Sequence, residues 1–269
     1  MQIAFSGGRS SALMLHHILE NNGGLDPDHV RVIFTNTGRE REETLDFVAT
    51  CGTRWGVEIV WLEYRYGNGP RAVEVDHATA SQNGEPFEAL IRRKRHLPNV
   101  AARYCTAELK VRTAKRWLVG QGWKNWTTAL GIRADEQSRL KYDPKERWQN
   151  WYPLAGAGIA RRDVAAFWAA QPFDLALAGE DGRTPLGNCD GCFLKSEAVR
   201  AALARDDPDR FAWWIEMEAL ASRLSNTPSG AYWRKDGSCA ELADFVARQG
   251  DWIFETEGAL CQAEAGECT

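Results

Sequence analysis

Positions 2–19 read QIAFSGGRSSALMLHHIL, and this stretch decides the fold. Residues 2–5 are a short apolar run of the strand type, and apolar residues recur at helical spacing over 12–19. The turn between them, residues 6–11, contains two glycines, which permit positive φ angles and a close approach of the backbone to a ligand. The start of the following helix offers free N–H groups and a positive dipole end to an anion. The stretch therefore predicts a strand, a phosphate-binding turn and a helix.

The same alternation continues along the chain. The pattern predicts a helix over 41–55 between strands over 30–34 and 57–62, and a later strand over 126–130. This β-α-β-α-β order is typical of a doubly wound α/β domain with a mainly parallel sheet and right-handed crossovers. Residues 135–150 are polar and loop-like.

Helical patterns dominate the second half of the sequence. We expect a domain boundary near residue 170, with a ligand-binding α/β domain at 1–170 and a mainly helical C-terminal lobe, which contains the C-x-x-C loop, at 171–269. Further helices are predicted over 85–95, 107–121, 161–170, 196–205, 208–225 and 238–249.

The composition excludes several classes of protein. Hydrophobic residues make up 44% and charged residues 26%, as in ordinary folded domains. No apolar run approaches the roughly 20 residues that cross a bilayer, and no signal-peptide pattern is visible, so we expect a cytoplasmic protein without a membrane partner. The net charge of −4 argues against binding nucleic acid through bulk positive charge, although residues 92–95 form a local basic run.

The glycine turn matches neither of two widespread nucleotide-binding patterns, because G-x-x-x-x-G-K-[ST] and G-x-G-x-x-G are both absent. A first strand that ends in S-G-G-x-x-S resembles instead the pyrophosphate loop (PP-loop) of N-type ATP pyrophosphatases. Within that superfamily the chain is more similar to the phosphoadenosine phosphosulfate (PAPS) reductase family. Four further family elements occur in order: TNTG at 35–38, RYCT at 103–106, GIRADEQSR at 131–139 and YPL at 152–154. The resemblance implies a three-layer, Rossmann-like (HUP-like) fold that binds an adenine nucleotide.

These elements supply candidate site residues. Arg133 and Arg139 are expected to clamp a phosphate or sulfate, because guanidinium groups bind such oxyanions bidentately. Lys110 adds positive charge, and Glu136 is expected either to hold Mg²⁺ or to orient Arg133. We expect these four residues to serve catalysis. Nucleotide binding is assigned to Ser6, Gly7, Gly8, Arg9, Ser10, Ser11, Thr35, Asn36, Thr37, Gly38 and Gly131.

Cysteines form a second candidate site. The seven cysteines include a C-x-x-C pair, Cys189 and Cys192, in a glycine-rich loop. This spacing lets two thiolates face one metal centre, and zinc sites, iron–sulfur clusters and redox dithiols all use it. An odd number of cysteines in a cytosolic chain favours metal or redox roles over disulfides. Cys51 and Cys239 are expected to be buried and structural.

The resemblance favours an iron–sulfur cluster. Cluster-bearing relatives place cysteine ligands in the element that holds Cys105 and complete the set with a later C-x-x-C. By this similarity Cys105, Cys189 and Cys192 bind a [4Fe–4S] cluster. Those relatives have two adjacent cysteines where this chain has one, so the fourth ligand is Cys268, Cys261 or an exogenous molecule; we expect Cys268.

Three functions follow from the resemblance. In the first, an ATP-using enzyme adenylylates a substrate oxygen, pyrophosphate leaves, and a sulfur donor replaces the activated oxygen. In the second, the chain is a sulfonucleotide (APS or PAPS) reductase that releases sulfite with thioredoxin. In the third, it is a non-catalytic module that binds a nucleotide and a cluster.

Sequence details favour the ATP-using enzyme. The chain keeps the complete Ser-Gly-Gly turn and adds Arg9, whereas the reductases commonly have a degraded loop. The reductases' E-C-G-x-H tail is missing, because Thr269 follows Cys268. Ser10, by contrast, stands where many ATP pyrophosphatases have aspartate, which counts against metal-assisted ATP chemistry but leaves a hydroxyl for phosphate. We therefore expect ATP and Mg²⁺ as cofactors, a sulfur donor such as a cysteine desulfurase as partner, a nucleic acid as a candidate substrate, and a homo-oligomer.

Overall fold

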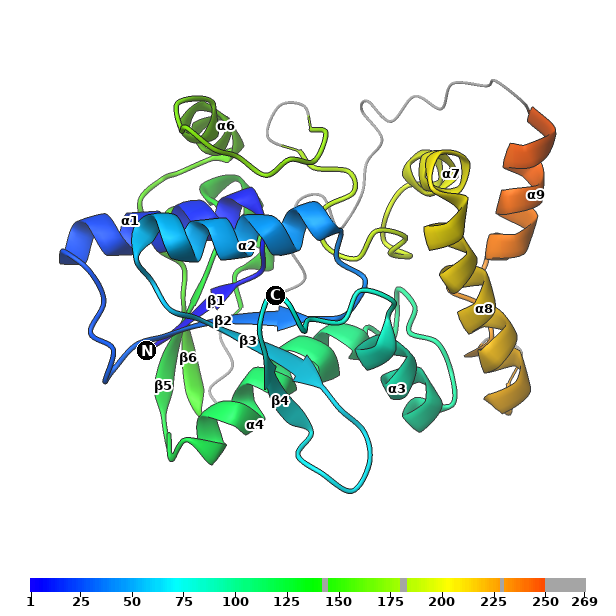
Figure 1. The fold of residues 1–269 in the computed structure, drawn as a ribbon, viewed down its shortest axis with the longest axis horizontal. Helices are drawn as coiled ribbons and strands as arrows, with labels where there is room; N and C mark the ends of the chain where they lie inside the picture. Colours follow the sequence, from blue (N-terminus) through cyan, green and yellow to red (C-terminus); the bar gives the residue numbers. More distant parts are fainter. Residues whose placement is uncertain (142–144, 180–182, 228–229, 250–269) are drawn as a thin grey trace.

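The computed structural model describes residues 1–141, 145–179, 183–227 and 230–249 (Figure 1). They contain a six-stranded sheet in the order β4-β3-β2-β1-β5-β6. β4 pairs antiparallel with β3, and the other neighbouring strands pair in parallel. The predicted doubly wound, mainly parallel sheet is therefore confirmed. The strands are β1 (Gln2–Phe5), β2 (Arg31–Asn36), β3 (Ile59–Tyr64), β4 (Ala72–Val75), β5 (Trp126–Leu130) and β6 (Trp148–Trp151).

Helices cover both faces of the sheet. Figure 1 shows α1 (Arg9–Asn22), α2 (Glu42–Trp55) and α6 (Arg161–Ala169) above the sheet and α4 (Arg112–Gly120) below it. α4 continues a π-helical segment, η1 (Thr106–Val111), and both lie against the central and β4-side strands. On that side β1, β5 and β6 form the floor of a pocket. Two short elements, η2 (Ala134–Arg139) and α5 (Pro153–Gly156), follow the ends of β5 and β6.

The side chains of the central strands alternate between the two faces. Ile3 and Phe5 of β1 and Phe34 of β2 join the core beneath α1 and α2. Ile33 points to the opposite face, where it packs with Leu118 of α4. β2 is buried on both faces, which explains why its sequence is an almost continuous apolar run.

A second core lies between α3 (Glu85–Lys94) and the C-terminal helices α7 (Glu197–Asp206), α8 (Pro208–Leu224) and α9 (Cys239–Gln249). The ring of Phe87 lies 5.6, 6.1 and 5.6 Å from those of Trp213, Trp214 and Trp233. The predicted helical C-terminal part is therefore confirmed. Leu175 and Leu177, which follow the predicted boundary at residue 170, pack in the core of the sheet domain.

Three local predictions differ from the structure. The helix predicted over 107–121 is divided into η1 and α4, and Thr113 Oγ1 donates a hydrogen bond to Glu108 O at 2.8 Å where the two meet. β4 was not predicted, and β6 overlaps the end of the stretch 135–150 that was expected to be a loop. Both are four-residue strands at the edges of the sheet, so neither needs an apolar run. Within the described residues, no helix is both long and apolar enough to span a membrane.

Candidate functional site

The turn after β1 is shaped by a glycine and a buried serine. Gly7 has a φ of +80°, and a Cβ at this position would lie 2.7 Å from Thr44 Cγ2. Ser11 Oγ donates to Gly8 O at 2.9 Å and accepts from Ser6 N at 3.2 Å and Ser6 Oγ at 3.0 Å. Ser11 is therefore an internal brace of the turn.

The turn leaves the N-terminus of α1 open. Gly8 occupies the N-cap, and among the described residues no side chain caps the helix and no acidic side chain stands in its first turn. The first backbone N–H groups of a 14-residue helix are thus directed at the carboxyl edge of the sheet, with the positive end of the helix dipole behind them. This arrangement suits the binding of a phosphate group.

Arg9 is held by the segment that follows the sheet domain. Its Nε and Nη2 donate to Asp174 Oδ1 and Oδ2, each at 2.8 Å. Nη1 donates to Thr184 Oγ1, and Nη2 also donates to Leu175 O, each at 2.7 Å. The structure therefore places Arg9, predicted as a phosphate ligand, in hydrogen bonds that connect the turn to Asp174, Leu175 and Thr184.

A glycine brings the end of β5 against the same turn. A Cβ on Gly131 would lie 2.9 Å from Ser11 Cα, so backbone meets backbone here. Two residues further on, Arg133 is 6% exposed and donates from Nη1 to Ser10 Oγ at 3.2 Å. Its Nε donates to Asp135 Oδ1 at 3.0 Å. Burial alone would raise the pKa of Asp135, but the hydrogen bonds and charge of Arg133 hold that pKa below its ordinary value.

Glu136 binds both predicted arginines. Its Oε2 accepts a hydrogen bond from Arg133 N at 3.0 Å, and its Oε1 accepts one from Arg139 Nη1 at 2.5 Å. The side chain is 5% exposed. Of the two roles predicted for Glu136, this placement fits the orientation of the arginines, and the binding of Mg²⁺ stays a prediction.

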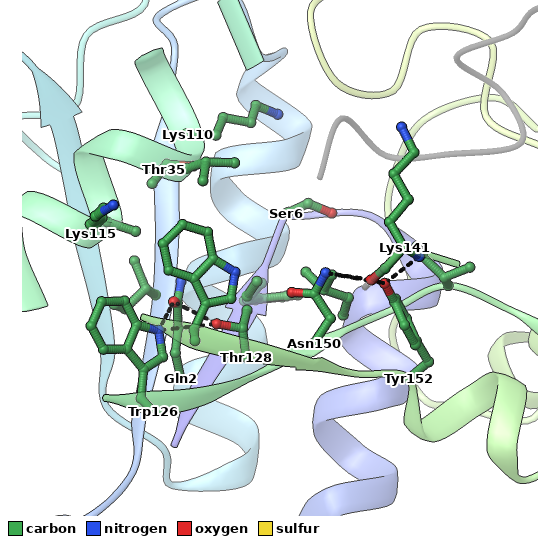
Figure 2. A pocket seen from close by; sticks show the side chains of 18 of the residues that line it. Gln2, Ser6, Thr35, Lys110, Lys115, Trp126, Thr128, Lys141, Asn150 and Tyr152 are labelled. Carbon is green, nitrogen blue, oxygen red and sulfur yellow. Dashed lines mark hydrogen bonds between the residues drawn. The ribbon is translucent and has the colours of Figure 1, made fainter. Parts of the chain in front are cut away.

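A pocket of about 200 Å³ lies on the α4 side of the sheet (Figure 2). Trp126 and Trp148 stack in its wall, with ring centroids 5.6 Å apart and an interplanar angle of 18°. Figure 2 shows Lys110 and Ser6 on one side of the pocket, Lys115 beside Trp126, and Lys141 beside Tyr152. A mainly apolar slot with basic groups around it is the kind of site that a purine nucleotide occupies. The residues that line the pocket include Gln2, Ser6, Thr35, Lys110, Trp126, Thr128, Arg139, Lys141, Trp148, Asn150 and Tyr152.

The turn after β2 directs most of its side chains into the protein. Asn36 Nδ2 donates to Glu63 Oε1 at 2.7 Å. Thr37 donates from N and Oγ1 to Glu40 Oε2, at 2.8 and 2.7 Å. Asn36 and Thr37 are each 1% exposed, whereas Thr35 lines the pocket. The TNTG element therefore contributes Thr35 to the pocket and uses Asn36 and Thr37 to build the turn.

The C-x-x-C loop docks on this turn through Asp190, which is fully buried. Asp190 Oδ2 accepts from Arg39 Nη2 at 3.0 Å and from Arg210 Nε at 2.5 Å, and Oδ1 accepts from Trp214 Nε1 at 2.9 Å. Sequence reasoning missed Arg39, Asp190 and Arg210. A weak signal was present, because Arg39 follows Gly38 and Asp190 follows Cys189 in the sequence. Nothing in the sequence showed that these side chains meet.

The three predicted cysteine ligands share one core. Cys189 and Cys192 are 8% and 7% exposed and belong to the apolar cluster against which Cys105 packs. Thr37 Oγ1 lies 3.3 Å from Cys189 Sγ. Within the described residues, no three or more His, Cys, Asp and Glu side chains form a set that could hold a metal ion. The predicted fourth ligand Cys268 and its alternative Cys261 lie outside the described residues.

The remaining described cysteines are buried, as predicted. Cys51, on the buried face of α2, is fully buried, and Cys239 at the start of α9 is 1% exposed. Burial raises the pKa of both thiols, to about 12 for Cys239, so neither is a thiolate at neutral pH.

The sheet, the open helix end and the pocket define a nucleotide-binding protein of the doubly wound α/β class. The family described as "Phosphoadenosine phosphosulfate reductase domain" matches residues 1–155, and the chain belongs to this family. The resemblance to PAPS reductases is thereby confirmed. The chain is also similar to the uncharacterized nin region protein ORF290 of Escherichia phage lambda. The two are 32% identical over 215 residues, which cover 76% of this chain and 69% of the phage protein.

Proposed function

We propose that the chain binds ATP in this pocket and transfers the adenylyl group to a substrate oxygen. The observation that carries the proposal is the open N-terminus of α1 beside a pocket lined by Ser6, Lys110 and Arg139. A triphosphate needs an anion site in addition to a purine slot, and the first N–H groups of α1 supply one. The proposal does not depend on Arg9, whose guanidinium binds Asp174.

The proposed reaction develops charge where the chain places basic groups. The acceptor oxygen attacks the α-phosphorus, the bond to the bridging oxygen breaks, and pyrophosphate leaves with the electron pair while the acceptor's proton passes to solvent. The N-terminus of α1 stabilises the leaving pyrophosphate, and Lys110, Arg133 and Arg139 neutralise charge at the reacting phosphate. Glu136 keeps the two arginines aligned. Mg²⁺ bound to the nucleotide would screen the charge of its phosphates.

Adenylylation prepares the oxygen for replacement by sulfur. In the next proposed step a persulfide or hydrosulfide attacks the carbon that carries the activated oxygen, a carbon–sulfur bond forms, and AMP leaves. A cysteine desulfurase would be a source of such sulfur. A cytoplasmic location and a homo-oligomeric state stay predictions.

The proposal includes a [4Fe–4S] cluster held by Cys105, Cys189, Cys192 and Cys268. Its support is that Cys189 and Cys192 share a tight turn, in which Cys192 N donates to Cys189 O at 3.3 Å. Both belong to the C-terminal hydrophobic core, and Cys105 packs against that core. A cluster with four cysteine ligands would tie the C-x-x-C loop to the element that holds Cys105, whereas an iron open to sulfur would exist only with three cysteine ligands. The described residues do not by themselves close a ligand set, so no step is assigned to the cluster.

Iron analysis tests the cluster directly. Anaerobically purified Cys192→Ser should lose its iron and acid-labile sulfide, whereas Cys51→Ala, a change at a buried cysteine outside the loop, should keep both. A Cys192→Ser protein with the full iron content of the parent would remove Cys192 from the ligand set.

The reaction is tested by offering both kinds of nucleotide to the anaerobic protein. One arm contains ATP and Mg²⁺, and the other contains APS or PAPS with thioredoxin. Pyrophosphate from ATP supports the proposal, and Arg139→Gln should reduce it while Arg162→Gln, at an 89% exposed side chain, should not. Sulfite without pyrophosphate would identify a reductase. Nucleotide binding without either product would identify a binding module.

A further inference from the structure

The last turn of α3 and the adjoining η1–α4 helix carry a concentration of basic side chains. α3 packs against η1, and α4 continues η1 toward the middle of the sheet (Figure 1). The five residues that we call the α3–α4 basic surface are Arg92, Arg93, Lys94, Arg112 and Arg116.

One buried carboxylate organises this surface. Glu108 is 2% exposed, and its oxygens lie 2.6 Å from Arg112 Nη1, 3.0 Å from Arg116 Nη2, 3.4 Å from Lys94 Nζ and 3.7 Å from Arg93 Nη1. Although burial alone would raise it, hydrogen bonds from Arg116 and Arg112 lower the pKa of Glu108 to about 2. The carboxylate is therefore ionised at neutral pH and holds four cations in one place.

The surface keeps a positive excess. Arg92 pairs with Glu88 at 2.6 Å, and the other four basic side chains share the single charge of Glu108. Among the described residues, these five basic groups meet two carboxylates, which leaves three positive charges in a protein whose net charge is −4. Arg92 and Arg112 are each 56% exposed, so the excess charge faces solvent.

The basic row runs beside the nucleotide pocket. Glu108, Arg112 and Arg116 follow one another at intervals of four and form one row along η1 and α4. A neighbouring face of the same helix lines the pocket, through Lys110, Val111, Ala114 and Lys115. A chain of phosphates on the basic row would therefore pass the side of the pocket.

One exposed and one half-buried aromatic ring stand among these cations. Tyr66 is 55% exposed, and Arg93 Cζ lies 5.9 Å from the centre of its ring. Lys94 Nζ lies 5.5 Å from the centre of the Tyr104 ring. Cations interleaved with aromatic rings are what single-stranded nucleic acids bind, because phosphates contact the cations and unpaired bases stack on the rings.

We propose that the α3–α4 basic surface binds a single-stranded nucleic acid, with phosphates on Arg92 and Arg112 and a base on Tyr66. The arginines suit phosphate because guanidinium binds it bidentately, and the exposed ring favours a nucleic acid over an acidic peptide. This inference names the substrate class of the proposed sulfur-transfer reaction and rests on that function only for the chemistry that follows binding.

Binding is measured by fluorescence anisotropy with labelled single-stranded DNA and RNA of about 20 nucleotides, without ATP. The test variant is Arg92→Gln with Arg112→Gln, and the matched control is Arg162→Gln with Arg205→Gln, which removes the same charge from α6 and α7. The test variant should bind about tenfold or more weakly at about 50 mM salt. Its salt slope should fall by about 1.4, or about 0.7 for each lost phosphate contact. The control should bind like the parent.

Tyr66→Ala distinguishes nucleic acid from any other polyanion. This variant should bind the oligonucleotides at least about fivefold more weakly with an unchanged salt slope, and it should bind heparin like the parent. Equal losses in the test and control variants, no binding by the parent, or polyglutamate binding as tight as that of the oligonucleotides would overturn the proposal. Circular dichroism melts of all variants confirm that they fold.

The two proposals fail separately. Oligonucleotide binding without pyrophosphate from ATP would support the α3–α4 basic surface as a nucleic-acid site and reject the adenylyl transfer. Pyrophosphate release with no oligonucleotide binding would support the adenylyl transfer and reject the nucleic-acid site. It would also direct the search for the acceptor to small molecules.

Discussion

The turns after β1 and β2 make the same type of contact with opposite consequences. Each contains an arginine that binds an aspartate from a later loop: Arg9 binds Asp174, and Arg39 binds Asp190. The side chains of the first pair are 12% and 40% exposed, and those of the second are 4% and 0% exposed. At β1 a partly exposed pair steadies a turn that stays open to a ligand. At β2 a buried pair seals the turn against the C-x-x-C loop. Two similar contacts thus belong to a turn that we propose binds the nucleotide and to a turn that serves as a scaffold.

Asp190→Ala should have the largest effect on this comparison. It leaves the guanidinium of Arg39 buried without its carboxylate and removes the partner of Arg210, so we expect a loss of about 3–5 kcal/mol in the free energy of unfolding. Urea denaturation of the full chain measures it. A loss below about 1 kcal/mol would mean that the buried pair does not hold the loop.

Gly38→Ala tests whether the β2 turn is a scaffold. Gly38 has a φ of +79°, and a Cβ there would lie 2.9 Å from Pro86 Cδ. We expect a loss of about 1–3 kcal/mol in the free energy of unfolding and an almost unchanged affinity for ATP. Urea denaturation and titration calorimetry give the two values. A selective loss of ATP affinity would show that this turn touches the nucleotide after all.

Gly7→Ala makes the matching change in the β1 turn. Gly7 has a φ of +80°, and an added Cβ would lie close to Thr44 Cγ2, so we expect strain similar to that of Gly38→Ala. Here the displaced backbone carries the N–H groups that would bind phosphate, so the affinity for ATP should also fall, by about tenfold or 1.4 kcal/mol. The same calorimetric titration measures it. If Gly7→Ala and Gly38→Ala bind ATP equally well, the distinction between the two turns is wrong.

Asp174→Ala should have the smallest effect. The Arg9–Asp174 pair is partly exposed, so solvent screens it and its loss should cost at most about 1 kcal/mol. The difference from the parent should shrink further in about 1 M salt. A cost as large as that of Asp190→Ala would contradict the distinction between exposed and buried pairs.

The sequence predicted the elements that obey local rules. The strand, glycine turn and helix at positions 2–19 are present, and so are the central parallel strands and the helical C-terminal part. Ser10 and Arg133, which stand in two separate predicted elements, are joined by a hydrogen bond across 123 positions. Apolar periodicity and glycine placement suffice for these features because both act within a few residues.

The directions of polar side chains could not be predicted. Arg9 and Asn36 stand in recognisable motifs, yet one binds Asp174 and the other binds Glu63. Both partners come from segments far along the chain, so no local pattern reveals them. The edge strands β4 and β6 were not predicted for a different reason: a short strand at the edge of a sheet needs little apolar surface.

The contact between Gly131 and Ser11 makes β5 and α1 one mechanical part. With no side chain between the two backbones, nothing compressible separates the strand end from the first turn of the helix. The hydrogen bond from Arg133 to Ser10 joins them a second time. If a bound anion displaced the N-terminus of α1, the guanidinium of Arg133 would therefore move with it. The helix end and the arginine would act as one rigid unit.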